Sequence, residues 1–116
     1  METGSALKVL AGLAQETRLA IFRLLVEVGH EGLLAGEIAT QLEIPGTTLS
    51  FHLKNMSQAG LVVSERLGTS IRYSADFDAM NGLVSYLTTN CCGGDLSACA
   101  PQKTKSTRRR KTVASR

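Results

Sequence analysis

A Pro-Gly break at positions 45 and 46 separates two short helical patterns, residues 33–42 and residues 47–59. This arrangement restricts the possible folds of the chain more than any other feature. In both stretches the apolar residues recur three or four positions apart, so they share one face of a helix. These residues are Leu34, Ile38 and Leu42 before the break and Leu49, Leu53 and Met56 after it. Because proline interrupts a helix and glycine favours a turn, the pattern predicts a helix, a short turn and a second helix.

Two helical patterns precede this unit, and a change of period follows it. Residues 7–14 carry one apolar stripe, and residues 16–28 carry a face wide enough to be buried. The leading positions of that second face are Leu19, Phe22 and Leu25. The next stretches, "LVVSERL" and "SIRYSAD", are rich in β-branched residues and predict a hairpin, and the helical period returns in residues 76–90. The expected fold is mainly α with a small β-hairpin, a winged helix-turn-helix.

The first and last helical patterns have apolar faces that a three-helix core cannot easily cover. An exposed apolar stripe of that length needs a partner surface. We therefore expect the chain to form a homodimer through its first and last helices.

Charge is distributed unevenly along the chain. Residues 1–102 carry six basic and ten acidic side chains, whereas residues 103–116 carry seven basic side chains and no acidic one. A basic segment attracts nucleic acid through the release of counterions, without reading sequence. The alternative, a solvated end without a partner, stays open.

Composition excludes several other classes of protein. No apolar run approaches the roughly 18–20 residues that span a bilayer, and the start "METGSALK" lacks the pattern of a signal peptide. We therefore expect a cytoplasmic protein without a membrane partner. Three cysteines are an odd number in a reducing compartment, which disfavours a framework of structural disulfides.

Three stretches resemble the ArsR/SmtB family of metal-responsive winged-helix repressors: "ETRLAIFRLL", "GEIATQLEIPGTTLSFHLKNMSQAGLV" and "SERLGTSIRYS". The end "LTTNCCGG" is similar to arsenic-responsive members with a vicinal cysteine pair after the last helix. The resemblance covers roughly residues 7–94. It implies a homodimeric repressor of double-stranded operator DNA, not an enzyme, without a prosthetic group.

Two metal sites known in the family have no counterpart in this sequence. Arsenic sensors with an "ELCVCDL" pattern carry cysteines at positions that align with Leu34 and Gly36. Zinc and nickel sensors use aspartate and histidine on the last helix, where this chain has Asp76 and Asp78 but no histidine. The cysteines near the end of the chain are the remaining candidates.

These patterns divide the chain into three parts. Residues 1–90 are expected to form the winged helix-turn-helix DNA-binding and dimerisation domain. Residues 91–102 form a cysteine-containing loop that binds the effector, and residues 103–116 form a basic, disordered tail.

The DNA-reading residues are expected on the second helix of the unit and on the hairpin. The N-terminal part of a recognition helix faces the base edges, where hydroxyls can hydrogen-bond and an apolar ring can contact a thymine methyl. The predicted DNA contacts are Thr47, Thr48, Ser50, Phe51, His52, Lys54, Arg66, Thr69 and Arg72. For His52, only the resemblance suggests a backbone contact, and an imidazole packed inside the domain is the alternative. Thr69 stands where the family commonly has a basic residue.

Every cysteine of the protein lies within nine positions, as Cys91, Cys92 and Cys99. Thiolates are soft ligands, and three of them suit trivalent arsenic or antimony, whereas zinc requires a fourth ligand. A methylated trivalent arsenic would need fewer thiols. We therefore expect arsenic(III), antimony(III) or a trivalent methylarsenical as the effector.

Three alternatives for the cysteines remain open. Neighbouring thiols can act as a redox switch, in a repressor without a metal ligand. A thiol enzyme or a metalloid carrier is a further alternative, although a helix C-terminus disfavours a thiolate. Finally, the cysteines could be incidental.

Overall fold

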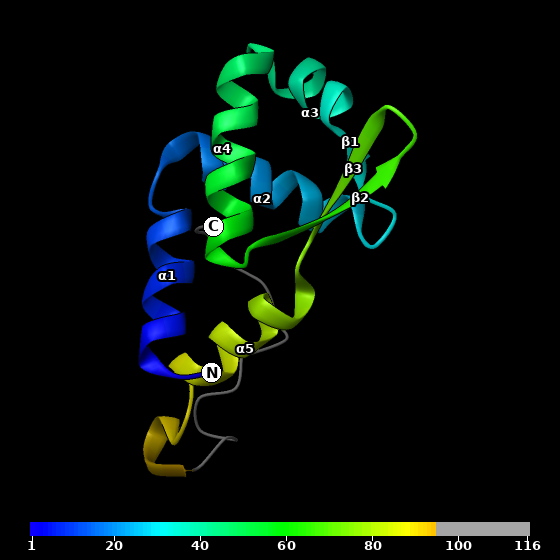
Figure 1. Cartoon of the computed structure of the whole chain (residues 1–116). Helices are drawn as coiled ribbons and strands as arrows, with labels where there is room; N and C mark the ends of the chain where they lie inside the picture. Colours follow the sequence, from blue (N-terminus) through cyan, green and yellow to red (C-terminus); the bar gives the residue numbers. More distant parts are fainter. Residues whose placement is uncertain (95–116) are drawn as a thin grey trace, which may run out of the picture.

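Five helices and a small sheet follow one another in the computed structural model, which describes residues 1–94 of the chain (Figure 1). The helices are α1 (Thr3–Leu13), α2 (Glu16–Val28), α3 (Ala35–Leu42), α4 (Gly46–Ala59) and α5 (Phe77–Leu87). The strands are β1 (Leu33–Leu34), β2 (Val62–Leu67) and β3 (Ser70–Ala75), and a short 3₁₀ segment covers Cys91–Gly94. This order confirms the predicted winged helix-turn-helix, in which α3 and α4 form the helix-turn-helix and β2 and β3 the wing.

The core forms around the inner face of α4. Leu49, Leu53 and Met56 are at most 2% exposed, at the spacing that the sequence predicted. The core residues of α2 and α3 are Ile21, Phe22, Leu25 and Ile38. One expectation was wrong: Leu19 is 44% exposed, because the core-facing side of α2 is centred on the Ile21–Leu25 side of the helix.

Side chains and glycine define several helix ends. The N–H of Arg18 donates to Gln15 Oε1 at 2.8 Å before α2, and that of Ala79 donates to Asp76 Oδ1 at 3.0 Å before α5. Such caps satisfy backbone donors that have no partner within the helix. Gly60 ends α4 in the left-handed region, at φ 82°.

The sheet has one strand that the sequence did not predict. Its order is β1-β3-β2, all antiparallel, and Leu33 and Leu34 pair with Tyr73 and Arg72. These two leucines were expected to begin the third helix, because two residues are too few to show the period of a strand. The pairing connects the wing directly to the start of α3.

The first and last helices pack together away from the wing. Thr3 Oγ1 and Tyr86 Oη are 2.6 Å apart, which joins the start of α1 to α5 in the lower half of Figure 1. Both helices also leave large apolar side chains exposed, and we call this set the α1/α5 apolar patch. Its members are Leu7, Leu10, Val84 and Leu87. None of the helices within residues 1–94 has the length and apolar character that crossing a bilayer requires.

Gly12 permits the close approach of α1 to the end of α4. A Cβ at this position would lie 2.6 Å from Leu61 Cδ1 and 3.1 Å from Ala59 Cβ. We expect Gly12→Ala to lower the free energy of unfolding by about 1–3 kcal/mol through overpacking. Gly36→Ala is the matched control, since nothing lies within 4 Å there, and it should raise stability by about 0.5–1 kcal/mol. Urea unfolding at one fixed protein concentration measures both, and equal effects would contradict the packing argument.

Candidate DNA-binding surface and cysteine segment

The outward side of α4 presents a row of polar and aromatic side chains to solvent. Thr47, Thr48, Ser50 and Lys54 are exposed, and Phe51 is 63% exposed although it is a large apolar residue. No acidic residue lies within Gly46–Ala59, so nothing on the helix itself repels phosphate. Hydroxyls, an aromatic ring and one ammonium group on an exposed helix can make base and backbone contacts in a major groove.

His52 lies on the inner side of the same helix. It is 9% exposed, and its Nδ1 atom is 3.5 Å from Arg18 Nη1. The guanidinium of Arg18 also donates from Nε to the carbonyl oxygen of Gly12 at 2.7 Å. His52 therefore has the internal packing that the sequence left open as the alternative, and its contact with DNA backbone stays a prediction.

The two arginines of the wing lie on opposite faces of the hairpin. Arg66 pairs with Ile71 in the register, whereas Arg72 pairs with Glu65. Opposed residues of an antiparallel pair share a face, and the next pair uses the other face, so the two cations leave the wing in different directions. Arg72 also makes an exposed ion pair with Glu65, with Nη1 and Oε1 4.0 Å apart, which contributes little to stability.

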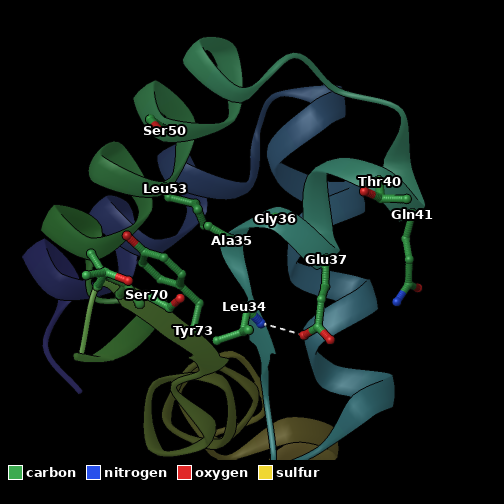
Figure 2. Close-up of a pocket in the computed structure, with 12 residues that line it drawn as sticks. Leu34, Ala35, Gly36, Glu37, Thr40, Gln41, Ser50, Leu53, Ser70 and Tyr73 are labelled. Carbon is green, nitrogen blue, oxygen red and sulfur yellow. Dashed lines mark hydrogen bonds between the residues drawn. The ribbon is translucent and has the colours of Figure 1, made fainter. Parts of the chain in front are cut away.

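A hollow of about 730 Å³ separates the wing from the helix-turn-helix (Figure 2). Ser50 and Leu53 of α4 line one side of it, and Tyr73 of the wing lies on another. Thr69 of the wing also lines the hollow. Two of the predicted DNA contacts, Ser50 and Thr69, therefore border one continuous groove. The groove is open to solvent, so a sugar-phosphate strand could lie between the wing and α4.

Sequence reasoning missed the contribution of α3 to this groove. Glu37, Thr40 and Gln41 line it from the side of α3 that faces away from the buried Ile38. Glu37 Oε1 accepts a hydrogen bond from the N–H of Leu34 at 2.8 Å, the contact drawn in Figure 2. Thr40 and Gln41 lie three and four positions after Glu37, so the three residues share the polar face of α3. This spacing is the sequence signal that could have identified them.

The cysteine pair follows α5 after a three-residue turn. Cys91 is half-buried, Cys92 is exposed, and both are free thiols. Asn90 and Cys92 have φ values of 58° and 53°, so the chain turns sharply at the pair. Among the described residues, no third cysteine, histidine or carboxylate completes a group that could hold a metal. The remaining predicted ligand, Cys99, lies outside the described residues.

The end of α5 is hydrogen-bonded close to this pair. The hydroxyl of Thr88 donates to the carbonyl oxygen of Val84, and that of Thr89 donates to Ser85, both at 2.8 Å. The N–H of Cys91 donates to the carbonyl oxygen of Thr88 at 3.0 Å. The backbone of the cysteine segment is thus connected to the last turn of α5 by hydrogen bonds.

Comparison with known proteins identifies this arrangement. Residues 13–65 match the family model of the helix-turn-helix domain. The uncharacterized HTH-type transcriptional regulator YbzH of Bacillus subtilis is 30% identical over 95 residues, which cover 72% of this chain and 95% of that relative. The chain belongs to the HTH-type transcriptional regulators. A second regulator of this type from the same organism, the uncharacterized YceK, is 37% identical over 59 residues, 51% of this chain and 58% of that relative's length.

Solved structures add ArsR-like proteins to the relatives of this HTH-type regulator. An ArsR-like transcriptional regulator from Rhodococcus sp. RHA1 has a TM-score of 0.66 and 29% identity, and the match covers 84% of this chain and 89% of that one. Mb0332 from Mycobacterium bovis, a possible ArsR-family regulator with a homodimeric winged helix-turn-helix DNA-binding domain, has a TM-score of 0.61 and 29% identity over 75% and 81% of the two chains. The fold of this HTH-type regulator is thus similar to that of ArsR-like proteins.

Phe51 and Lys54 should affect the binding of this HTH-type regulator to DNA in different ways. Phe51→Ala should weaken binding to an operator selected from random duplexes by roughly tenfold and leave non-specific binding unchanged, because an apolar contact reads a base. Lys54→Gln should weaken both duplexes and reduce the salt slope by about 0.9, because it removes one phosphate contact. Fluorescence anisotropy at several salt concentrations measures both effects. If Phe51→Ala weakened both duplexes equally, the base contact would be refuted.

Proposed function

We propose that this regulator is a homodimeric repressor that binds operator DNA and leaves it when trivalent arsenic binds Cys91, Cys92 and Cys99. The single observation that carries the effector assignment is the pair of free thiols at Cys91 and Cys92, connected by hydrogen bonds to the end of α5. Antimony(III) would use the same three sulfurs, and a trivalent methylarsenical would use fewer of them.

The α1/α5 apolar patch supports the homodimer. Leu7, Val84 and Leu87 are each at least 57% exposed, which is costly for large apolar side chains that have no partner. The winged helix-turn-helix DNA-binding domain of the similar protein Mb0332 is homodimeric. Two recognition helices about 34 Å apart would reach successive turns of the major groove, so a dimer binds a two-fold operator.

A charge within the patch should separate the protomers. Val84→Glu would bury a carboxylate at the dimer interface and should raise the dimer dissociation constant by roughly a hundredfold or more. Val63→Glu is the matched control, because Val63 is 48% exposed on the wing. Sedimentation velocity measures both variants, and a wild-type monomer at micromolar concentration would contradict the homodimer.

The donor set of the cysteine segment fits a soft metalloid better than a hard cation. Cys91 and Cys92 offer two sulfurs next to each other, and thiolates prefer thiophilic ions to calcium or magnesium. Zinc would need four ligands, and no other candidate ligand lies near the pair among residues 1–94. Two sulfurs suffice for an arsenic(III) that carries one organic group, and Cys99 would supply the third for arsenite.

The contact between α5 and α1 gives a route from the cysteines to the DNA-binding surface. Binding that orders the segment after α5 would displace the last turn of that helix, which Tyr86 joins to Thr3. A displacement of α5 would alter the angle between protomers and hence the spacing of the two recognition helices. The coupling must come from tighter binding of arsenic to the DNA-free state, typically by about 1–3 kcal/mol.

Titration of the protein–DNA complex with arsenite tests this function. Arsenite should release the reduced wild-type protein, and Cys91→Ser and Cys92→Ser should each abolish release while DNA affinity stays unchanged. Cys99→Ser separates three-sulfur from two-sulfur coordination, and zinc is the matched ion control. If arsenite left the complex intact, arsenic sensing would be refuted, although DNA binding would stand.

A thiol-redox repressor is the second candidate. The exposed sulfur of Cys92 is accessible to an oxidant, and a structural neighbour, HlyU from Vibrio cholerae, is known in a reduced form, with 27% identity, a TM-score of 0.57 and coverage of 75% and 92% of the two chains. Adjacent cysteines form a disulfide only with strain, so oxidation would favour a bridge to Cys99 or to the partner subunit. Release by peroxide but not by arsenite would establish this alternative. Specific DNA binding by the reduced protein would exclude a metalloid carrier.

A further inference from the structure

A second hollow, about 310 Å³ in volume, lies between α1, the start of α2 and the C-terminal half of α4. Its polar lining residues are Lys8, Arg18, Asn55 and Gln58. The small residues Ala11 and Gly12 also line it, so a ligand can approach close to the backbone of α1. The hollow therefore combines two cations with two side-chain amides that can donate hydrogen bonds.

Arg18 is fixed in place by bonds that leave much of its guanidinium available. Nε donates to the carbonyl oxygen of Gly12 at 2.7 Å, and Nη1 lies 3.5 Å from Nδ1 of His52. These contacts use two of the five N–H donors of an arginine. The guanidinium is half-buried and oriented before any ligand arrives, which reduces the entropy cost of binding.

Charge in the hollow is not compensated by the described protein. Within residues 1–94 the sole ion pair is that between Glu65 and Arg72 on the wing, so neither Lys8 nor Arg18 has a carboxylate within 4.0 Å there. None of the lining residues is acidic. Two cations and amide donors around one small volume are complementary to a tetrahedral oxyanion such as phosphate.

The position of the hollow connects it to the DNA-binding side of α4. Asn55 and Gln58 follow the exposed Phe51 at i+4 and i+7, so the three residues lie along one side of the helix. From Phe51 to Gln58 the helix rises about 10 Å, so the hollow lies about two helical turns beyond Phe51. A strand that passes Phe51 can thus continue towards the hollow.

The α1/α5 apolar patch leaves the hollow accessible. With about 100° between successive residues of a helix, Lys8 lies on one flank of the buried side of α1, and Leu7 and Leu10 lie on the other. Dimerisation through the patch would not cover Lys8 or Arg18.

We propose that this hollow binds a backbone phosphate of DNA beyond the bases that the N-terminal half of α4 reads. The inference rests on the proposed binding of operator DNA and extends its contact area to α1 and α2. Lys8 and Arg18 neutralise the phosphate, and the amides of Asn55 and Gln58 hydrogen-bond its oxygens. The contact adds affinity without base preference.

Inorganic phosphate tests the hollow without DNA. Titration of the full-length protein, at constant ionic strength adjusted with chloride, should shift the NMR signals of the Asn55 and Gln58 side-chain amides. Lys8→Gln and Gln58→Glu should each weaken this shift at least threefold. Arg23→Gln is the matched control, because Arg23 is an exposed cation that lines neither hollow. Absence of any shift at up to 50 mM phosphate, together with an unchanged salt slope for DNA, would overturn the proposal.

The salt dependence of DNA binding distinguishes a DNA phosphate from a free anion. Lys8→Gln should lower the slope by about 0.9 and weaken specific and non-specific duplexes alike, by threefold to tenfold, and Arg23→Gln should not. A phosphate-dependent NMR shift with no change of slope would overturn the DNA phosphate as occupant in favour of a free anion. If the protein bound no DNA at all, the proposed function and the DNA phosphate would fail together, and the NMR titration would still decide whether the hollow binds an anion.

Discussion

The burial of the inner face of α4 orients the rest of the molecule. Leu49, Leu53 and Met56 are nearly inaccessible, and burying each contributes about 1.5–3 kcal/mol, so rotating α4 about its axis would cost much of the stability of a small domain. Once that face is fixed, the direction of the outward side is fixed as well. Its N-terminal half presents Phe51 and its hydroxyl neighbours to solvent, and its C-terminal half borders the hollow beside α1. The specificity of the surface therefore depends on apolar residues that do not touch DNA.

Like α4, the short helix α1 has sides that face different parts of the molecule. Ala6 and Val9 face the core, Leu7 and Leu10 face solvent, and Lys8 borders a charged hollow. Small side chains on the buried face let this helix lie close to the end of α4, where larger residues would force it outwards. The helix that supports the proposed dimer is therefore packed directly against the predicted recognition helix.

Much of this fold could be predicted from the sequence, because its helices have regular apolar spacing and its breaks contain proline and glycine. The failures occurred where neighbours in space decide the outcome. Leu33 and Leu34 form a strand only because β3 lies beside them, and Leu19 is exposed because its face of α2 has nothing to cover it. Lys8 of α1 and Arg18 of α2 line the same hollow. The spacing of residues along the sequence does not show such a contact between two helices. For the cysteine pair the opposite holds. The sequence shows that the two cysteines are adjacent, but their spacing alone does not identify the ligand that they bind.

The pairing of β1 with β3 has a mechanical consequence. Gly32, with φ at 71°, allows the chain to pass so close to Tyr73 that a Cβ there would lie 2.4 Å from its carbonyl oxygen. The wing is therefore connected to the residues directly before α3 as well as to the end of α4. Because of this pairing, a movement of the wing would also move the start of α3. The positions of the wing and of the helix-turn-helix on DNA would therefore be coupled. If both elements bind DNA as predicted, a signal that tilts the domain would disturb the two contacts together.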